Sequence, residues 1–194
     1  METTQTGLAI VNQEELVKIV NKLYGNKENK KGLLVLGKTG TGKSSTMKSI
    51  LGNSVSAFNL QNVIDPANYQ LEIRSHLQSG VCETTTVITH KDSHYPRTDI
   101  YPTGVFIDDI GTDKSINRFG NIIDPIEYSI QYLYDKGIRL WANSNLNINE
   151  LSEKYGERVI SRLKEMCYIV VLEAPDHRDT LDKDLEYLKD IVNV

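Results

Sequence analysis

The sequence predicts an α/β fold in which helices flank a parallel sheet. Short apolar segments, typical of buried strands, alternate along the chain with segments whose apolar residues recur at the helical spacing. A glycine-rich loop directly follows the strand-like segment 32–36, and two aspartates lie near the end of the strand-like segment 104–111. No internal repeat, low-complexity tract or long linker divides the chain. We therefore expect a single domain over residues 1–194.

Buried strands are predicted wherever a short apolar segment is bounded by turn-forming or charged residues. The predicted strands are 32–36, 54–58 (the weakest), 104–111, 138–142 and 167–172. Residues 84–90 carry a further strand-like pattern, whereas residues 93–102 are expected to form a loop.

Helices are predicted where a capping residue precedes apolar residues at the helical spacing. Asn12 can cap a leading helix over 12–24, and Glu15 stands three residues further on, which is the spacing of a capping box. The other predicted helices are 43–51, 65–80, 124–137, about 149–164 and a terminal helix over 180–192.

The composition excludes several classes of protein. Hydrophobic residues make up 39% and charged residues 25% of the 194 residues, which is usual for a globular domain. No apolar stretch is long enough to cross a membrane, and no secretory signal is evident. Two cysteines, Cys82 and Cys167, are too few for a disulfide framework, so we expect a cytoplasmic protein. The net charge of −4 argues against strong nucleic-acid binding by an isolated subunit, though not against weak binding by an assembly.

Residues 37–44 match the pattern G-x-x-x-x-G-K-[ST] of a phosphate-binding loop. The glycines let backbone N–H groups turn toward phosphate oxygens, and the helix that starts near Lys43 adds the positive end of its dipole. Lys43 is expected to reach the β- and γ-phosphates, and Ser44 to hold Mg²⁺. The loop joins a predicted strand to a predicted helix, which favours a nucleotide site over a simple turn. The candidate nucleotide-binding residues of this segment are Gly37, Lys38, Thr39, Gly40, Thr41, Gly42, Lys43, Ser44 and Ser45.

A second part of the site is predicted near the end of the strand 104–111. A phosphate-binding loop needs an acid beside Ser44 to complete the Mg²⁺ shell, and Asp108 suits that role. Asp109 could orient or deprotonate the attacking water. Two adjacent acids can also merely cap a loop, but their place after a phosphate-binding loop favours the catalytic interpretation.

Two further groups of polar residues follow later in the chain. Asn143 and Asn145 come after the strand 138–142 and could position water near the γ-phosphate; turn-forming asparagines are the alternative. Arg158 and Arg162 stand one turn apart on a predicted helix. They could stabilise charge on the nucleotide of a neighbouring subunit, or they could belong to a solvated helix face.

The order of these motifs resembles that of the AAA+ ATPases of the DnaC/DnaI helicase-loader group, and it is similar to that of the related IstB-type transposition helper ATPases. The resemblance covers roughly residues 30–178. It is carried mostly by 104–178, through the segments IDDIG, SNL and GERVISRLKEMC. It implies a P-loop NTPase fold of the AAA+/ASCE type, a three-layer sandwich with a parallel five-stranded sheet in the order 5-1-4-3-2. It also implies a bare ATPase core in which the helical lid is absent or minimal.

The resemblance also implies roles for individual residues. Asn143 and Asn145 compete for the sensor-1 position of these ATPases. Arg162 resembles their arginine finger, with Arg158 as the alternative. Arg178, just after the last predicted strand, resembles sensor 2.

The function that the resemblance implies is that of an ATPase that assists DNA replication as a helicase loader. ATP/ADP and Mg²⁺ are the implied ligands, and a replicative helicase and single-stranded DNA are the implied partners. ATP at subunit junctions is expected to assemble a homo-oligomer. The alternatives are an IstB-like transposition helper and a nucleotide-binding regulatory module with little turnover. Asp109 keeps the last alternative open, because many AAA+ proteins carry the longer glutamate there. A small-molecule kinase is disfavoured, since no arginine-rich lid is evident.

Overall fold

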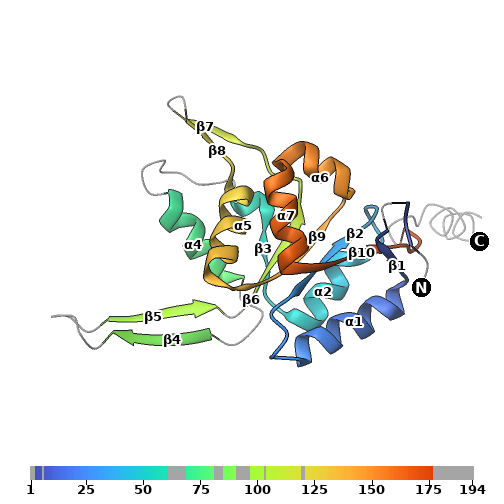
Figure 1. The fold of residues 1–194 in the computed structure, drawn as a ribbon, viewed down its shortest axis with the longest axis horizontal. Coiled ribbons are helices and arrows are strands. Elements are labelled where there is room, and N and C mark those ends of the chain that lie inside the picture. The colour runs from blue at the N-terminus through green and yellow to red at the C-terminus, as the bar shows by residue number, and fades with distance from the viewer. Residues whose placement is uncertain are drawn as a thin grey trace, which may run out of the picture.

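A parallel sheet of six strands forms the centre of the molecule (Figure 1). The computed structural model describes residues 3–5, 7–60, 69–80, 85–90, 97–102, 104–118 and 121–176. Within them the strands of this sheet stand side by side in the order β1-β10-β2-β9-β6-β3. Their bounds are β1 Ala9–Val11, β2 Gly32–Leu36, β3 Val55–Ser56, β6 Gly104–Ile110, β9 Arg139–Ser144 and β10 Cys167–Leu172.

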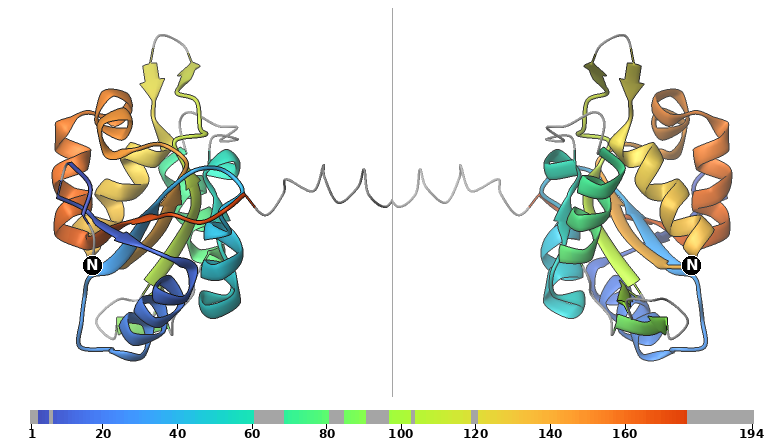
Figure 2. Two further views of the ribbon diagram at one scale, coloured as in Figure 1. Left: turned by 90° about the vertical axis from the view of Figure 1, so that its right-hand side faces the viewer. Right: turned by 90° about the vertical axis from the view of Figure 1, so that its left-hand side faces the viewer.

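Helices connect the strands and cover both faces of the sheet, which gives three layers (Figure 2). Helices α5, α6 and α7 pack on one face, and α1 and α2 pack on the other. The bounds of the helices are α1 Gln13–Gly25, α2 Lys43–Leu51, α3 Ala57–Leu60, α4 Tyr69–Ser79, α5 Pro125–Lys136, α6 Ile148–Tyr155 and α7 Glu157–Met166.

Side chains along the central strand β2 alternate between the two faces of the sheet, as strand geometry requires. Leu34 and Leu36 belong to the core shared with α5, α6 and α7. Leu33 and Val35 belong to the core shared with α1 and α2. Because helices cover both faces, every residue of β2 is buried. This is why the strand reads in the sequence as an unbroken apolar run.

The sheet has six strands instead of the five predicted, so its full order differs from the expected one. The added strand, β1, pairs in parallel with β10, from Ala9 opposite Val170 to Val11 opposite Leu172. The other five strands, numbered along the chain from β2, stand in the order 5-1-4-3-2 among themselves. Three residues carry too little pattern to predict β1, whose strand conformation depends on pairing with a segment far along the chain.

Other elements also differ from the prediction. Residues 97–102, predicted as a loop, form a strand that pairs antiparallel with residues 85–90. The resulting hairpin projects from the layered body (Figure 1). The single helix predicted over 149–164 is two helices, because Gly156, with φ of +82°, ends α6 and starts α7. A second hairpin was also not predicted. The hairpin strands are β4 Thr85–His90, β5 Arg97–Pro102, β7 Ile116–Arg118 and β8 Asn121–Ile123.

Several predicted elements are confirmed with their boundaries, namely the strands 32–36 and 167–172 and the helix 43–51. The terminal helix predicted over 180–192 lies outside the described residues, as does the expected start of the helix 65–80. In the part of the chain that the structure describes, no helix is both long and apolar enough to span a membrane.

The capping box of α1 gives a test of the fold. The Asn12 side chain accepts the Glu15 N–H at 3.0 Å, and the Glu15 carboxylate accepts the Asn12 N–H at 3.0 Å. We expect Asn12→Ala to lower the free energy of unfolding by about 1 kcal/mol, because it leaves a helix N–H without its acceptor. Asn12→Asp, which keeps a capping oxygen, should be close to the wild type. Urea unfolding measures both, and equal stabilities of the two variants would contradict the assigned cap.

Candidate nucleotide-binding site

The glycine-rich loop has the backbone shape of a phosphate cradle. Gly40 and Gly42 have φ of +83° and +84°, a left-handed conformation that side chains disfavour. At Gly37 an added Cβ would come within 2.6 Å of the Leu172 carbonyl oxygen, so the loop packs closely against the end of β10. Gly42 is the N-cap of α2, and among the described residues no side chain caps this helix. The first turn of α2 therefore offers backbone N–H groups and the positive end of the helix dipole to an anion.

The Lys43 side chain is buried inside this loop, with 4% of the residue exposed. Its Nζ donates to the carbonyl oxygens of Gly37 at 2.8 Å and Lys38 at 2.7 Å, and to Oδ1 of Asn145 at 2.8 Å. Thr41 fastens the loop further, because its hydroxyl donates to the Lys38 carbonyl at 2.9 Å. The ammonium group is thus held at the centre of the loop by oxygen acceptors.

Asp108 lies at the centre of a cluster of polar contacts near the carboxyl end of β6. Its Oδ1 accepts from Nδ2 of Asn143 at 2.7 Å, and its Oδ2 lies 2.5 Å from Nζ of Lys48. The same Asn143 Nδ2 donates to Oγ of Ser44 at 3.3 Å. Burial by itself raises the pKa of Asp108, but hydrogen bonds from Lys48, Asn143 and Ser44, with the charge of Lys48, hold that pKa below its ordinary value. The carboxylate is therefore kept ionised next to Ser44.

Asp109 occupies an irregular point of the strand. The pairing of β6 with β9 shifts register between Ile107 and Ile110, and Asp109 has φ of +58°. Its backbone N–H donates to Oδ1 of Asn143 at 2.7 Å. A left-handed backbone is uncommon for a residue other than glycine and often marks a functional position. The bulge separates the two acids: Asp108 contacts α2, while Asp109 lines the cavity beside the loop.

A cavity of about 400 Å³ opens beside the glycine-rich loop. Six of the predicted residues line it from the loop and the start of α2, Asp109 and Asn145 line it from β6 and the turn after β9, and Gln13 lines it from α1. The six are Thr39, Gly40, Gly42, Lys43, Ser44 and Ser45.

The donors around the cavity suit a nucleotide with Mg²⁺. The glycine backbone and Lys43 supply N–H donors for phosphate oxygens. The Ser44 hydroxyl and the Asp108 carboxylate, brought together through Asn143, are the hard oxygen ligands that Mg²⁺ prefers.

The predicted arginines lie away from this cavity. Arg162 is partly buried on α7, with its guanidinium carbon 5.4 Å from the centre of the Tyr134 ring. Arg158 is exposed one turn earlier. Neither is among the residues that line the cavity. The third predicted arginine, Arg178, lies outside the described residues.

Two residues of the site were not predicted from the sequence. Lys48 pairs with Asp108, and a signal for it existed, because Lys48 stands one helical turn after Ser44 on the same face of α2. Gln13 lines the cavity and donates to the hydroxyl of Thr46. No local pattern indicates that contact, since it depends on how α1 packs against α2.

Comparisons with known proteins support the fold assignment. Neither the protein-family models nor the curated proteins contain a significant match to this chain. Among solved structures, DnaI is similar over 85% of this chain and 84% of its own, with 14% identity and a TM-score of 0.56. A candidate primosome component from Streptococcus pyogenes serotype M3 is similar over 91% and 88%, with 16% identity and a TM-score of 0.53. The DnaC helicase loader matches less closely, with 17% identity over 83% and 90% and a TM-score of 0.45. The chain thus has the α/β P-loop fold of DnaI, as its resemblance to the DnaC/DnaI group implies.

Proposed function

We propose that this protein binds and hydrolyses ATP and assists DNA replication as a helicase loader. The observation that carries the proposal is the convergence of Lys43, Ser44 and Asp109 around one cavity, with Asp108 held beside Ser44 through Asn143, in a chain with the fold of DnaI. The fold alone would be compatible with many uses of a nucleotide. The two acids beside a lysine and a serine are what favour hydrolysis of the phosphoanhydride bond of ATP.

Each residue of the loop has a task in this proposal. The backbone N–H groups of the glycine-rich loop and of the first turn of α2 bind the phosphates. Lys43 leaves the carbonyl oxygens of Gly37 and Lys38 and turns to the β- and γ-phosphates. Ser44 and Asp108 hold Mg²⁺. When bound, the ion neutralises charge on the β- and γ-phosphate oxygens.

Asp109 is the residue that we propose to orient and deprotonate the attacking water, because it lines the cavity. Of the two asparagines, Asn145 is the better candidate for sensor 1, because it lines the cavity and contacts Lys43. Asn143 is completely buried and contacts Asp108, Asp109 and Ser44, so it suits a positioning role.

The arginines act in trans in this proposal. Arg162, or Arg158 in its place, reaches the nucleotide of a neighbouring subunit, which fits the fact that neither arginine lines the cavity of its own chain. ATP then favours assembly of a homo-oligomer, and Arg178 acts as sensor 2. The replicative helicase is the proposed protein partner. Single-stranded DNA is bound weakly by each subunit, in keeping with the net charge of −4.

A regulatory module that binds nucleotide with little turnover is the second candidate. The specific observation in its favour is the ion pair between Lys48 and Asp108, which places an ammonium group on the acid that we assign to Mg²⁺. An IstB-like transposition helper would share the same site and would differ in its partner.

The decisive experiment measures ATP turnover and particle size with and without single-stranded DNA and the replicative helicase. We expect ATP-dependent assembly, turnover stimulated by DNA or helicase, and a complex with the helicase. Lys43→Ala, which removes the phosphate-binding cation, should lose tight ATP binding. ATP binding without turnover under any of these conditions would favour the regulatory module. A complex with a transposase instead of the helicase would favour the transposition helper.

The ion pair of Lys48 gives a prediction about Mg²⁺. Removing the competing ammonium in Lys48→Met should lower the Mg²⁺ concentration needed for half-maximal nucleotide binding several-fold. A fluorescent nucleotide titrated with Mg²⁺ measures it. Lys18→Met is the matched control, because Lys18 also pairs with an acid, Glu14, at 2.5 Å on an exposed helix face. An unchanged Mg²⁺ requirement would show that Lys48 does not compete with the ion.

In the absence of nucleotide and metal, the effect of Lys48→Met on stability should depend on pH. Asp108 has a lowered pKa in the folded protein, so its ion pair stabilises the fold above the ordinary carboxyl pKa and ceases to do so as the pH falls through the lowered value. At pH 7, Lys48→Met should therefore be less stable by about 1 kcal/mol or less, since Lys48 is half-exposed. The difference should shrink below about pH 4, as measured by urea unfolding at several pH values.

The arginine proposal predicts a separation of binding from turnover. Arg162→Ala should leave ATP affinity of the monomer unchanged and reduce assembly-dependent turnover at least tenfold, because the charge that stabilises the transition state is lost. Arg74→Ala is the matched control: Arg74 also lies over a tyrosine ring, 5.0 Å from the centre of Tyr132. If Arg162→Ala retains full turnover and Arg158→Ala does not, Arg158 takes the role.

A further inference from the structure

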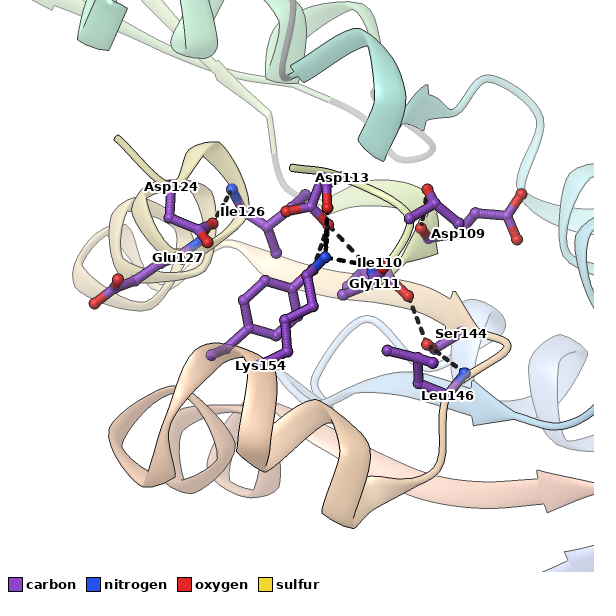
Figure 3. A network of polar contacts seen from close by, with 12 residues as sticks. Asp109, Ile110, Gly111, Asp113, Asp124, Ile126, Glu127, Ser144, Leu146 and Lys154 are labelled. Atoms are coloured by element: carbon purple, nitrogen blue, oxygen red, sulfur yellow. Dashed lines mark hydrogen bonds and ion pairs between the residues drawn. The ribbon is translucent and has the colours of Figure 1, made fainter. Parts of the chain in front are cut away.

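A buried acid follows the two acids of the candidate site. Asp113 lies in the loop after β6, with 2% of the residue exposed. Its Oδ1 accepts the N–H of Gly111 at 3.3 Å and the hydroxyl of Tyr155. Nζ of Lys154 donates to the carbonyl oxygens of Gly111, at 3.0 Å, and of Asp113, and lies 3.7 Å from Oδ1 of Asp113 (Figure 3). Two adjacent residues of α6 thus hold the loop at Gly111 and Asp113.

The segment held in this way begins with Asp109. Asp109 and Gly111 have φ of +58° and +104°. The Asp109 carbonyl accepts both the N–H and the hydroxyl of Thr112, at 3.2 and 2.8 Å, which closes a tight turn. The Ile110 carbonyl accepts the Ser144 hydroxyl at 2.5 Å. The turn is therefore fastened to β9 on one side and to α6 on the other, and its first residue is the acid that lines the cavity.

A buried carboxylate is an unusual way to fix a turn, because burial of an acid is unfavourable unless its partners compensate. Asp113 also affects the pKa values of two neighbouring residues, Tyr155 and Asp124. Burial first, and then the hydrogen bond to Asp113, raise the pKa of the Tyr155 phenol far above its ordinary value. Burial also raises the pKa of Asp124 at the start of α5, with the charge of Asp113 among the further causes. Within the described residues, Oδ2 of Asp113 has no hydrogen-bond partner. An apolar residue would fill this buried position without the unfavourable burial of a charged group.

We propose that Asp113 is a positioning residue for Asp109. Together with Lys154 and Tyr155 it clamps the loop 109–113 onto α6, so that Asp109 keeps its left-handed backbone and its side chain stays at the cavity. The clamp itself is a property of the fold. Its consequence for water activation rests on the proposed ATPase function.

Hydrogen–deuterium exchange of the nucleotide-free protein tests the clamp without reference to activity. We expect Asp113→Ala and Tyr155→Phe to speed amide exchange over residues 109–113 about tenfold, while exchange in the loop 37–42 stays unchanged. Tyr155→Phe is the milder change and keeps the test open if Asp113→Ala does not fold. Asp124→Asn is the matched control, because it removes a nearby acid but keeps a helix cap. Unchanged exchange over 109–113 in a folded clamp variant would overturn the proposal.

Kinetics then test the positioning role. Asp113→Ala should leave the affinity for ATP within about twofold of the wild type and lower turnover at least tenfold. In an Asp109→Asn background, Asp113→Ala should have little further effect on turnover, because both changes disable the same group. Independent, multiplicative losses would overturn the positioning role, as would full turnover in a variant with a loosened loop. Absence of turnover in the wild type would overturn the proposed function, whereas the exchange result would still decide whether Asp113 holds the loop.

Discussion

The candidate site depends on one buried side chain, the amide of Asn143. It donates to Asp108 and Ser44 and accepts the backbone N–H of Asp109, and Asn143 itself is completely buried. Its partners belong to β6 and α2, while Asn143 itself belongs to β9. Leaving such a group without partners in the interior is unfavourable, and satisfied buried networks favour a single arrangement. The folded state therefore fixes strand, helix and bulge relative to one another before any ligand arrives.

Sequence patterns predicted those parts of the fold that local rules determine. The strand 32–36 is an unbroken apolar run because helices cover it on both faces, and α1 begins at Asn12 because its side chain and that of Glu15 form a capping box. β1 escaped prediction because a distant strand supplies its hydrogen-bond partners. The break at Gly156 was also not predicted, because apolar residues recur at the helical spacing on both sides of this glycine. The backbone conformation of Gly156 nevertheless ends one helix and starts the next.

In the candidate site, too, the features set by local sequence were predicted, and those set by contacts between distant segments were not. The glycine-rich loop and the two acids follow from spacing alone, because the chemistry of phosphate binding requires neighbouring residues in a set order. Lys48 could have been inferred from its helical spacing to Ser44. Gln13 and Asp113 could not, because they enter the site through packing between elements that are far apart in sequence. For the same reason the sequence left Asn143 and Asn145 as equivalent candidates, whereas the structure buries the first and places the second at the cavity.

Gly156 joins α6 and α7 at a corner of one residue, since it is both the C-cap of the first helix and the N-cap of the second. Lys154, which holds the turn after the acids, is two residues before this corner, and the exposed Arg158 is two residues after it. A hydrogen bond also links the two helices across this corner: the Ser152 hydroxyl donates to the Glu157 carboxylate at 2.6 Å. The exposed Arg158 on α7 is therefore linked, through α6 and the turn that follows Asp109, to one wall of the cavity.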